Sequence, residues 1–205
     1  MLRVHRIPFS TNVERVALAA AHKRLEIEWV DHDASDRSAI RALSGQDLVP
    51  VLERDDDVLI DSMAIVAQFE ADRPEPALYP HDPAQRAEVE VFVDWFNRVW
   101  KVAPNAIDAE LERPAPDAGR ITAWEAELRG SLERFEALLT GRDFLMGDVL
   151  GAADIAAFPF LKYGVLYDPA DDERFHQILI EHLRPGDEHP NLVAWIARMD
   201  ALPRA

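Results

Sequence analysis

The spacing of apolar and polar residues divides the chain into two halves of different character. In the first half, residues 2–6 and 27–30 have the short pattern of strands, and residues 13–23 between them have apolar positions at helical spacing. The tripeptide Ser-Thr-Asn at 10–12 precedes that helix, and all three residue types are favoured at helix N-termini. This strand–helix–strand order, completed within about thirty residues, has the usual size of a parallel crossover unit.

The elements that follow complete a small α/β domain. Residues 36–43 are predicted to form a short helix, and residues 48–52 and 58–60 two strands at hairpin distance. The three aspartates at 55–57 form the charged turn between these strands, and residues 61–72 have an apolar face typical of a helix. The predicted order is therefore βαβαββα, which is typical of a thioredoxin-like domain.

Prolines separate this half from the rest of the chain. Pro74 and Pro76 end the preceding helix, and Pro80 and Pro83 follow within the next few residues. We therefore predict a domain over residues 1–75, a linker over 76–83 and a second domain over 84–205.

The second half has no strand signal. Large apolar residues recur at helical spacing from Phe92 to Ala103 and from Ile121 to Leu139, and a proline-containing segment separates the two runs. Shorter helices are predicted over residues 153–166, 173–183 and 190–201. The fold class predicted from the sequence is thus α/β plus all-α, with a thioredoxin-like domain followed by a bundle of four or five helices.

Composition and charge narrow the choice of partners. Of 205 residues, 48% are hydrophobic, which is enough to build a core, and the formal net charge is −16. An acidic chain repels phosphates, so we expect no nucleic-acid partner. No signal peptide and no apolar stretch long enough to cross a membrane are evident, so we expect a cytoplasmic protein without a membrane partner.

The sequence contains no cysteine, so the protein cannot supply a thiolate of its own as nucleophile or metal ligand. The seven histidines show no zinc-binding spacing, and no metal is expected. No glycine-rich nucleotide loop is present. The aromatic residues of the second half have the spacing of core residues, although one edge of that group could line a pocket.

Three short motifs in the first half stand where a helix or a strand is predicted to begin. Ser10 precedes the first predicted helix and stands five residues before Arg15, so its hydroxyl lies at a helix N-terminus. A hydroxyl that donates to sulfur favours the thiolate, which is the reactive form of a thiol. Val49-Pro50 begins a strand, and Asp61-Ser62 begins the third helix, where an anion can bind. Taken singly, each motif is also an ordinary helix cap or an edge-strand proline.

A fourth motif lies in the second half, over residues 147–159. Gly151 occupies a helix N-cap position, and Asp154 stands three residues later, as in a capping box. The four motifs in this order resemble those of the serine-type cytosolic glutathione transferases, including bacterial members, and the resemblance covers nearly the whole chain. Leu48 and Gly151 depart from the family pattern, which often has Lys or Gln two residues before the proline and Ser or Thr at the cap.

The resemblance implies specific roles. Ser10 would be the catalytic residue that stabilises the thiolate of glutathione, with Thr11 or Asn12 as a substitute donor. The backbone of Val49, before a proline that is typically cis in this family, would pair with the cysteinyl part of glutathione, so that the ligand lies across Val49-Pro50. The γ-glutamyl end would bind at Asp61 and Ser62. The resemblance thus implies that Ser10 is catalytic and that the thiol-binding residues are Thr11, Asn12, Val49, Pro50, Asp61 and Ser62.

The predicted activity is conjugation of a glutathione-type co-substrate to a small-molecule electrophile, as in detoxification, by a protein expected to form a homodimer. Two alternatives remain open on the sequence. The same bound thiol could serve an isomerase or a peroxidase, or the fold could be a non-catalytic thiol-binding or protein-interaction module. The identity of the thiol is also open.

Overall fold

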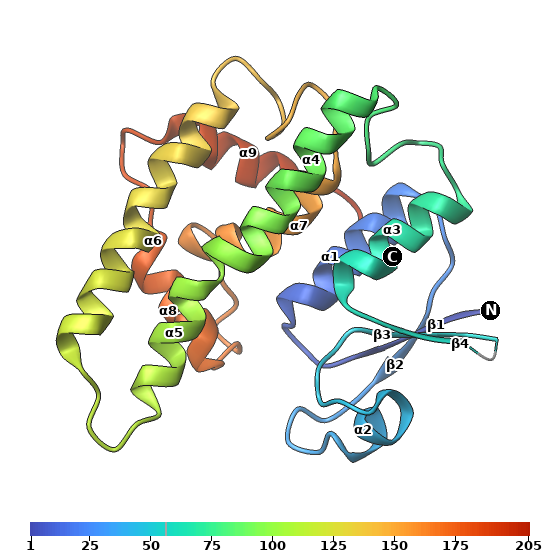
Figure 1. Ribbon diagram of the computed structural model, residues 1–205, viewed down its shortest axis with the longest axis horizontal. Helices are drawn as coiled ribbons and strands as arrows, with labels where there is room; N and C mark the ends of the chain where they lie inside the picture. Colours follow the sequence, from blue (N-terminus) through green and yellow to red (C-terminus); the bar gives the residue numbers. More distant parts are fainter. Residues whose placement is uncertain (56) are drawn as a thin grey trace. The chain divides into compact units, whose positions relative to one another are not determined.

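The computed structural model describes residues 1–55 and 57–205; Asp56 of the predicted charged turn lies outside this description. Contacts divide the described chain into two compact units (Figure 1). Unit 1 comprises Met1–Tyr79 together with Leu202–Ala205, and unit 2 comprises Pro80–Ala201. The last four residues therefore belong to the unit in which the chain begins.

Unit 1 is built on a four-stranded sheet with the order β2-β1-β3-β4. The strands are β1 (Leu2–Arg6), β2 (Glu28–Asp31), β3 (Val51–Arg54) and β4 (Asp57–Ile60). β1 pairs in parallel with β2 and antiparallel with β3, and β3 pairs antiparallel with β4. The predicted crossover unit and the predicted hairpin are both confirmed.

Three helices complete unit 1: α1 (Thr11–His22), α2 (Ser38–Ser44) and α3 (Ser62–Asp72). Helices α1 and α3 pack side by side, and α2 lies apart from them on the other side of the strands (Figure 1). Gly45 ends α2 in the left-handed conformation, with φ of 75°, as is common for glycine after a helix. The observed order βαβαββα is the predicted one.

A buried ion pair joins the end of α1 to α3 and to the segment after it. Lys23 is fully buried and contacts Glu70, and its Nζ also donates to the carbonyl oxygens of Pro74 and Pro76 at 3.1 and 2.6 Å. Glu70 in turn accepts from the backbone N–H of Leu78 at 3.0 Å. Charge pairing and hydrogen bonding together offset the burial of both groups.

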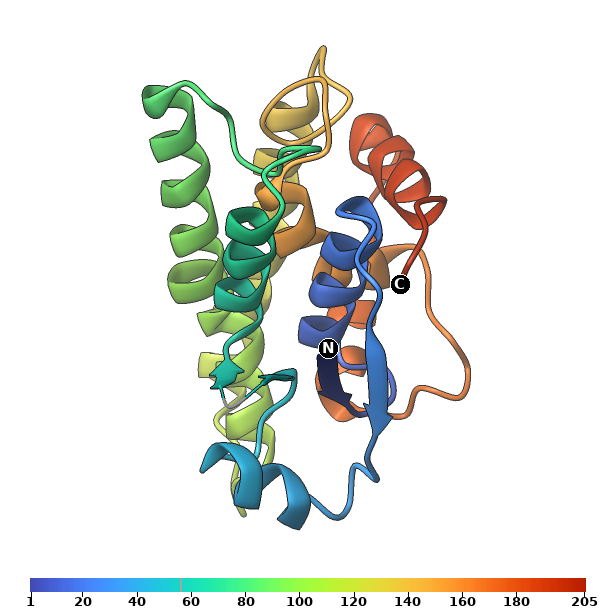
Figure 2. The ribbon, with the colours of Figure 1, turned by 90° about the vertical axis from the view of Figure 1, so that its right-hand side faces the viewer.

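Unit 2 is helical throughout its regular elements. Its helices are α4 (Pro83–Trp95), the π-helix η1 (Phe96–Trp100), α5 (Val102–Leu111), α6 (Ala118–Leu139), α7 (Ala152–Leu161), the 3-10 helix η2 (Lys162–Gly164), α8 (Arg174–His182) and α9 (Pro190–Asp200). Figure 2 shows the long helices α4 and α6 in the turned view. Among the described residues, none of the helices combines the length and apolar character needed to cross a membrane.

The first predicted helix of unit 2 is interrupted, which the apolar spacing did not indicate. Residues Phe96–Trp100 form a π-helix, in which Lys101 N donates to Phe96 O at 3.1 Å. Pro104 provides a physical reason, because a proline has no N–H to donate to the carbonyl four residues earlier, here that of Trp100. α4 and α5 are thus two helices joined by an irregular turn.

Helix α7 is the buried centre of unit 2. All ten of its residues are buried, and Asp154 accepts hydrogen bonds from the backbone N–H groups of Leu145 and Gly151 and from Trp195 Nε1, at 2.8–3.0 Å. Gly151 is the N-cap and, as expected for glycine, contributes no side-chain bond. A buried carboxylate with this set of donors holds the start of α7 against α9.

Candidate functional site

Ser10 lies where the sequence places it, at the start of α1. It is the N-cap residue, it is half-buried, and its Oγ accepts from Val13 N at 3.4 Å. This interaction uses an oxygen lone pair and leaves the hydroxyl proton available. Within the described residues that proton has no hydrogen-bond acceptor. Capping of the helix and donation to a ligand are therefore compatible roles for Ser10.

Thr11 and Asn12 differ in their surroundings. Thr11 is the first residue of α1 and is 6% exposed, whereas Asn12 is half-buried. The side-chain amide oxygen of Asn12, Oδ1, accepts from Arg15 Nη1 at 3.2 Å and from the Ser62 hydroxyl at 3.4 Å. Asn12 thus connects the start of α1 to the start of α3.

The Val49–Pro50 peptide is cis, and both residues are buried. β3 begins only at Val51, so the ladder to β1 stops one residue short of Pro50. In the part of the chain that the structure describes, the backbone N–H and C=O of Val49 have no hydrogen-bond partner. Buried backbone groups are nearly always paired, so these two are candidates for pairing with a bound ligand.

Asp61 and Ser62 begin α3 in a strained turn. Asp61 has φ of 72° and ψ of 121°, a region that residues other than glycine rarely adopt. Its Oδ1 accepts from the N–H groups of Met63 and Ala64 at 2.9 and 3.0 Å, and its Oδ2 makes no hydrogen bond among the described residues. Ser62 is buried, and its hydroxyl faces Asn12 and Arg15. Strain of this kind is frequent at ligand-binding turns.

Arg15 is a residue whose importance the sequence did not reveal. Its sequence position indicates only a spacing of five residues from Ser10, yet it is 1% exposed and donates from Nη1 to Asn12 and to Ser62, each at 3.2 Å. Burial lowers the pKa of Arg15 to about 9, and the negative charge of Asp61 acts in the opposite direction. At neutral pH the group is still charged, so a buried cation lies between the starts of α1 and α3.

An apolar cluster brings the motifs of unit 1 together. Val13 of α1 packs in one buried group with Val49 and Val51, beside the cis peptide, and with Ile7 and Ile40. The Asn12–Arg15–Ser62 contacts connect the same end of α1 to α3. The three motifs predicted from separate parts of the sequence therefore converge on the N-terminal end of α1.

Leu48 departs from the family pattern, and its side chain is 70% exposed. The amide of Gln46 is bonded to the backbone of Leu48 in both directions, with Nε2 donating to Leu48 O at 2.7 Å and Oε1 accepting from Leu48 N at 2.6 Å. Gln46 therefore holds the backbone of Leu48, the residue that precedes Val49. Both polar atoms of the Gln46 side-chain amide are thus hydrogen-bonded to Leu48.

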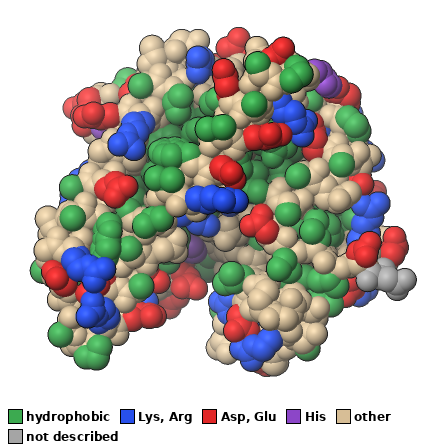
Figure 3. All heavy atoms as spheres, viewed as in Figure 1, with side chains coloured by type: hydrophobic (Ala, Val, Ile, Leu, Met, Phe, Trp, Pro, Cys, Tyr) green, Lys and Arg blue, Asp and Glu red, His purple; other side chains and the backbone are tan. Residues whose placement is uncertain are grey.

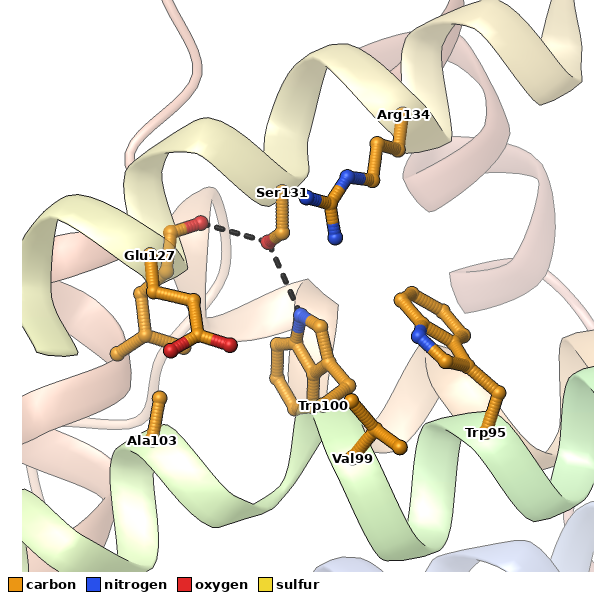
Figure 4. A pocket seen from close by; sticks show the side chains of 8 residues that line it. Trp95, Val99, Trp100, Ala103, Glu127, Ser131 and Arg134 are labelled. Carbon is orange, nitrogen blue, oxygen red and sulfur yellow. Dashed lines mark hydrogen bonds between the residues drawn. The ribbon is translucent and has the colours of Figure 1, made fainter.

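Unit 2 contains a pocket of its own between α6 and the α4–η1–α5 segment (Figure 4). Trp100 donates to Ser131 Oγ at 2.9 Å, and Ser131 donates to Leu128 O at 2.6 Å. The enclosed volume is about 10 Å³, enough for one water molecule. Phe96 and Trp100 are buried core residues, as predicted, and the pocket has no room for an electrophile.

Among the described residues, neither the distribution of charged side chains nor the placement of potential metal ligands indicates a further binding site. On the face seen in Figure 3, acidic and basic side chains lie interspersed. Among residues 1–55 and 57–205, no group of three or more His, Asp or Glu side chains is placed to hold a metal ion.

Comparisons with known proteins give family matches in both units. Residues 4–77 match the model of the glutathione S-transferase N-terminal domain, and residues 112–203 match that of the glutathione S-transferase C-terminal domain. The chain belongs to the glutathione S-transferase family. It is 31% identical over 190 residues to glutathione S-transferase GstB of Escherichia coli strain K12, covering 84% of this chain and 89% of that protein.

Two further relatives of this glutathione S-transferase family member are informative. It is 30% identical over 172 residues to maleylacetoacetate isomerase of Pseudomonas aeruginosa, covering 78% of this chain and 81% of the isomerase. The crystal structure of a theta class glutathione S-transferase from Xanthomonas axonopodis pv. citri with glutathione bound is 26% identical. It aligns with a TM-score of 0.72 over 98% of this chain and 93% of that chain.

Proposed function

We propose that this glutathione S-transferase family member conjugates glutathione to a small electrophile, with Ser10 as the residue that stabilises the thiolate. One observation carries the proposal: the Ser10 hydroxyl caps α1 through its oxygen and keeps its proton for another acceptor. A sulfur anion at this position would also benefit from the helix N-terminus.

The remaining contacts proposed for glutathione use polar groups of unit 1 that converge on the start of α1. The N–H and C=O of Val49 would pair with the cysteinyl residue, beside Pro50. Ser62 and the N-terminus of α3 would hold the γ-glutamyl carboxylate, and the free Oδ2 of Asp61 would accept from the ammonium group. Asn12, and Thr11 at the first position of α1, would border the sulfur.

The test is the rate of conjugation of glutathione to 1-chloro-2,4-dinitrobenzene. Loss of one hydrogen bond to the thiolate weakens its stabilisation by about 1.5–3 kcal/mol, so Ser10→Ala is expected to lower kcat/KM by about 10- to 100-fold. Ser10→Thr keeps the hydroxyl and is expected to stay active. Ser35→Ala, on an exposed turn of unit 1, is the matched control and is expected to change nothing.

A third variant separates capping from catalysis. Ser10→Asp retains a good helix cap but places a negative charge at the sulfur, so the protein is expected to be as stable as the wild type and inactive. An active Ser10→Asp protein, or an unchanged kcat/KM in Ser10→Ala, would remove Ser10 from the mechanism.

A second candidate is a glutathione-dependent isomerase, which the relative named maleylacetoacetate isomerase favours. Both reactions need the same bound thiol, so Ser10 has the same role in each, and a screen of cis-alkene dicarboxylates against electrophiles distinguishes them. Calorimetric titration with glutathione tests the non-catalytic alternative, which predicts binding without turnover. A two-fold homodimer and a cytoplasmic location, both expected from the resemblance, stay predictions.

A further inference from the structure

The residues just before the cis peptide offer no cation to a ligand that lies across Val49. Leu48 is apolar and 70% exposed, and both polar atoms of the Gln46 side-chain amide bond to the Leu48 backbone. Asp47 carries a negative charge, which disfavours a second carboxylate nearby. A ligand with a carboxylate at this end of the site therefore needs a cation from another segment.

The proposed orientation of glutathione places one of its carboxylates at this end. The γ-glutamyl carboxylate would bind at Ser62 and the cysteinyl residue at Val49, so the glycyl carboxylate would lie on the far side of Val49 from α3. Helix α2 lies on the other side of the strands from α3 (Figure 1). The glycyl end is thus directed toward α2 and the segment that joins α2 to β3.

Arg37, the N-cap residue of α2, is held against that segment by two backbone carbonyl groups. Its Nε donates to Ala34 O at 3.1 Å and its Nη1 donates to Asp47 O at 3.0 Å, and the residue is half-buried. Consecutive Cα atoms are about 3.8 Å apart, so the bond to Asp47 keeps the guanidinium group within about 10 Å of the Val49 backbone. The glycyl carboxylate stands one residue beyond the cysteinyl residue, which brings the guanidinium group within its reach.

The charge of Arg37 is not paired with an acid. Among the described residues, its guanidinium group forms no ion pair and its Nη2 makes no hydrogen bond. Asp47 pairs instead with Arg41, with Nε 2.8 Å from Oδ1 and Nη2 2.9 Å from Oδ2. The hydrogen bond from Arg41 and, more weakly, the charge of Arg37 hold the pKa of Asp47 below its usual value, although burial acts in the opposite direction. The neighbouring Asp36 accepts from Ser38 N at 3.0 Å.

We propose that Arg37 binds the glycyl carboxylate of glutathione and thereby selects thiols that carry a free carboxylate at this end. A guanidinium group suits this role, because its fork of N–H donors matches a carboxylate and its charge strengthens the hydrogen bonds. The inference rests on the proposed function, since it concerns the thiol held at Ser10 and Val49. It assigns to the start of α2 a role that the apolar Leu48 cannot perform.

The experiment compares two ligands by calorimetric titration: glutathione, and glutathione ethyl ester, in which the glycyl carboxylate is blocked. The wild type is expected to bind glutathione about 10-fold more tightly than the ester, because only the free carboxylate accepts a charge-assisted hydrogen bond. Arg37→Gln keeps a donor for the Asp47 carbonyl group and removes the charge. It is expected to bind both ligands with the wild-type affinity for the ester.

Arg54→Gln is the matched control, because Arg54 is an exposed arginine of unit 1 at the end of β3 and pairs with Asp72. It is expected to keep the wild-type preference for glutathione. An Arg37→Gln protein that folds and still prefers glutathione about 10-fold would overturn the inference, as would a wild type that binds the two ligands equally.

Asp47→Asn changes the charge in the opposite direction. It removes the negative charge beside the proposed carboxylate site and keeps the backbone carbonyl that accepts from Arg37. The preference for glutathione over the ester is expected to rise about 3-fold above that of the wild type. An unchanged or smaller preference contradicts the inference, so the question is decided even if Arg37→Gln does not fold.

Failure of the proposed function would look different. In that case the wild type would bind neither ligand, or Ser10→Ala would leave the rate of conjugation unchanged. Turnover that depends on Ser10, together with equal affinity for glutathione and its ester, overturns only the role of Arg37.

Discussion

Arg15 offers the sharpest test of how unit 1 is organised for binding. Replacing it with Met keeps much of the side-chain volume and removes, among the interactions of Arg15, the donations at 3.2 Å to Asn12 Oδ1 and to Ser62 Oγ. A hydrogen bond from a charged group contributes about 1.5–3 kcal/mol, so the two together contribute about 3–6 kcal/mol. The variant also removes a cation that is only 1% exposed, and burial of such a charge costs several kcal/mol.

These opposing terms predict a specific pattern. The free energy of unfolding of Arg15→Met is expected to fall by only about 1–2 kcal/mol, because the lost bonds and the relieved burial of charge nearly cancel. Glutathione binding is expected to weaken more, by about 10- to 100-fold, because Ser62 loses its fixed orientation and the γ-glutamyl carboxylate loses a nearby cation. Urea unfolding and calorimetric titration with glutathione measure the two quantities.

Arg73→Met is the matched control for this experiment. Arg73 donates to the carbonyl oxygens of Lys23 and Arg24, each at 2.7 Å, at the other end of α1. Its loss is expected to lower stability without changing the Kd for glutathione. An Arg15→Met protein that loses several kcal/mol of stability yet binds glutathione normally would refute the reasoning and make Arg15 a purely structural residue.

Two further predictions concern buried ionisable groups. Lys23→Met and Glu70→Gln are each expected to lower the free energy of unfolding by about 3–5 kcal/mol, and the double variant Lys23→Met/Glu70→Leu by much less than the sum, as urea unfolding of all three would show. Burial raises the pKa of Asp154 to about 6, although its backbone donors act to lower it. Since this is above the unfolded-state value near 3.8, the folded state gains about 2–3 kcal/mol relative to Asp154→Asn as pH falls from 7 to 4. Urea unfolding of both proteins at the two pH values measures the difference, and parallel curves would contradict it.

The arrangement of unit 1 could be predicted because its local signals agree. Period-two and period-3.6 patterns gave the order βαβαββα, and Ser10, Asp61 and Ser62 stand at the helix starts that the structure shows. Helix caps and strand alternation are set by neighbouring residues, so they can be recognised in a single sequence. The roles of these residues toward a thiol, and the domain division at residues 76–83, stay predictions.

Contacts between distant residues were beyond this reasoning. Arg15 has an unremarkable place in the helical pattern, and only the arrival of Ser62 from 47 positions away makes it a buried bridging cation. Likewise, the apolar spacing from Phe92 to Ala103 fits a continuous helix, and the π-helical turn arises where Pro104 removes a backbone donor. Such features depend on which segments meet, and a periodic pattern does not contain that information.

The packing of Leu202–Ala205 against the first unit has a consequence for the order in which the chain folds. Trp29 and Ala205 are 176 positions apart, and Glu14 and Arg204 are 190 apart, so each of these bonds closes a very long loop. The entropy of closing a loop grows with its length, so such contacts become favourable only after the intervening chain has condensed. Unit 1 would therefore be completed only after unit 2 has condensed, and a fragment cut after Tyr79 would lack the contacts of Leu202–Ala205.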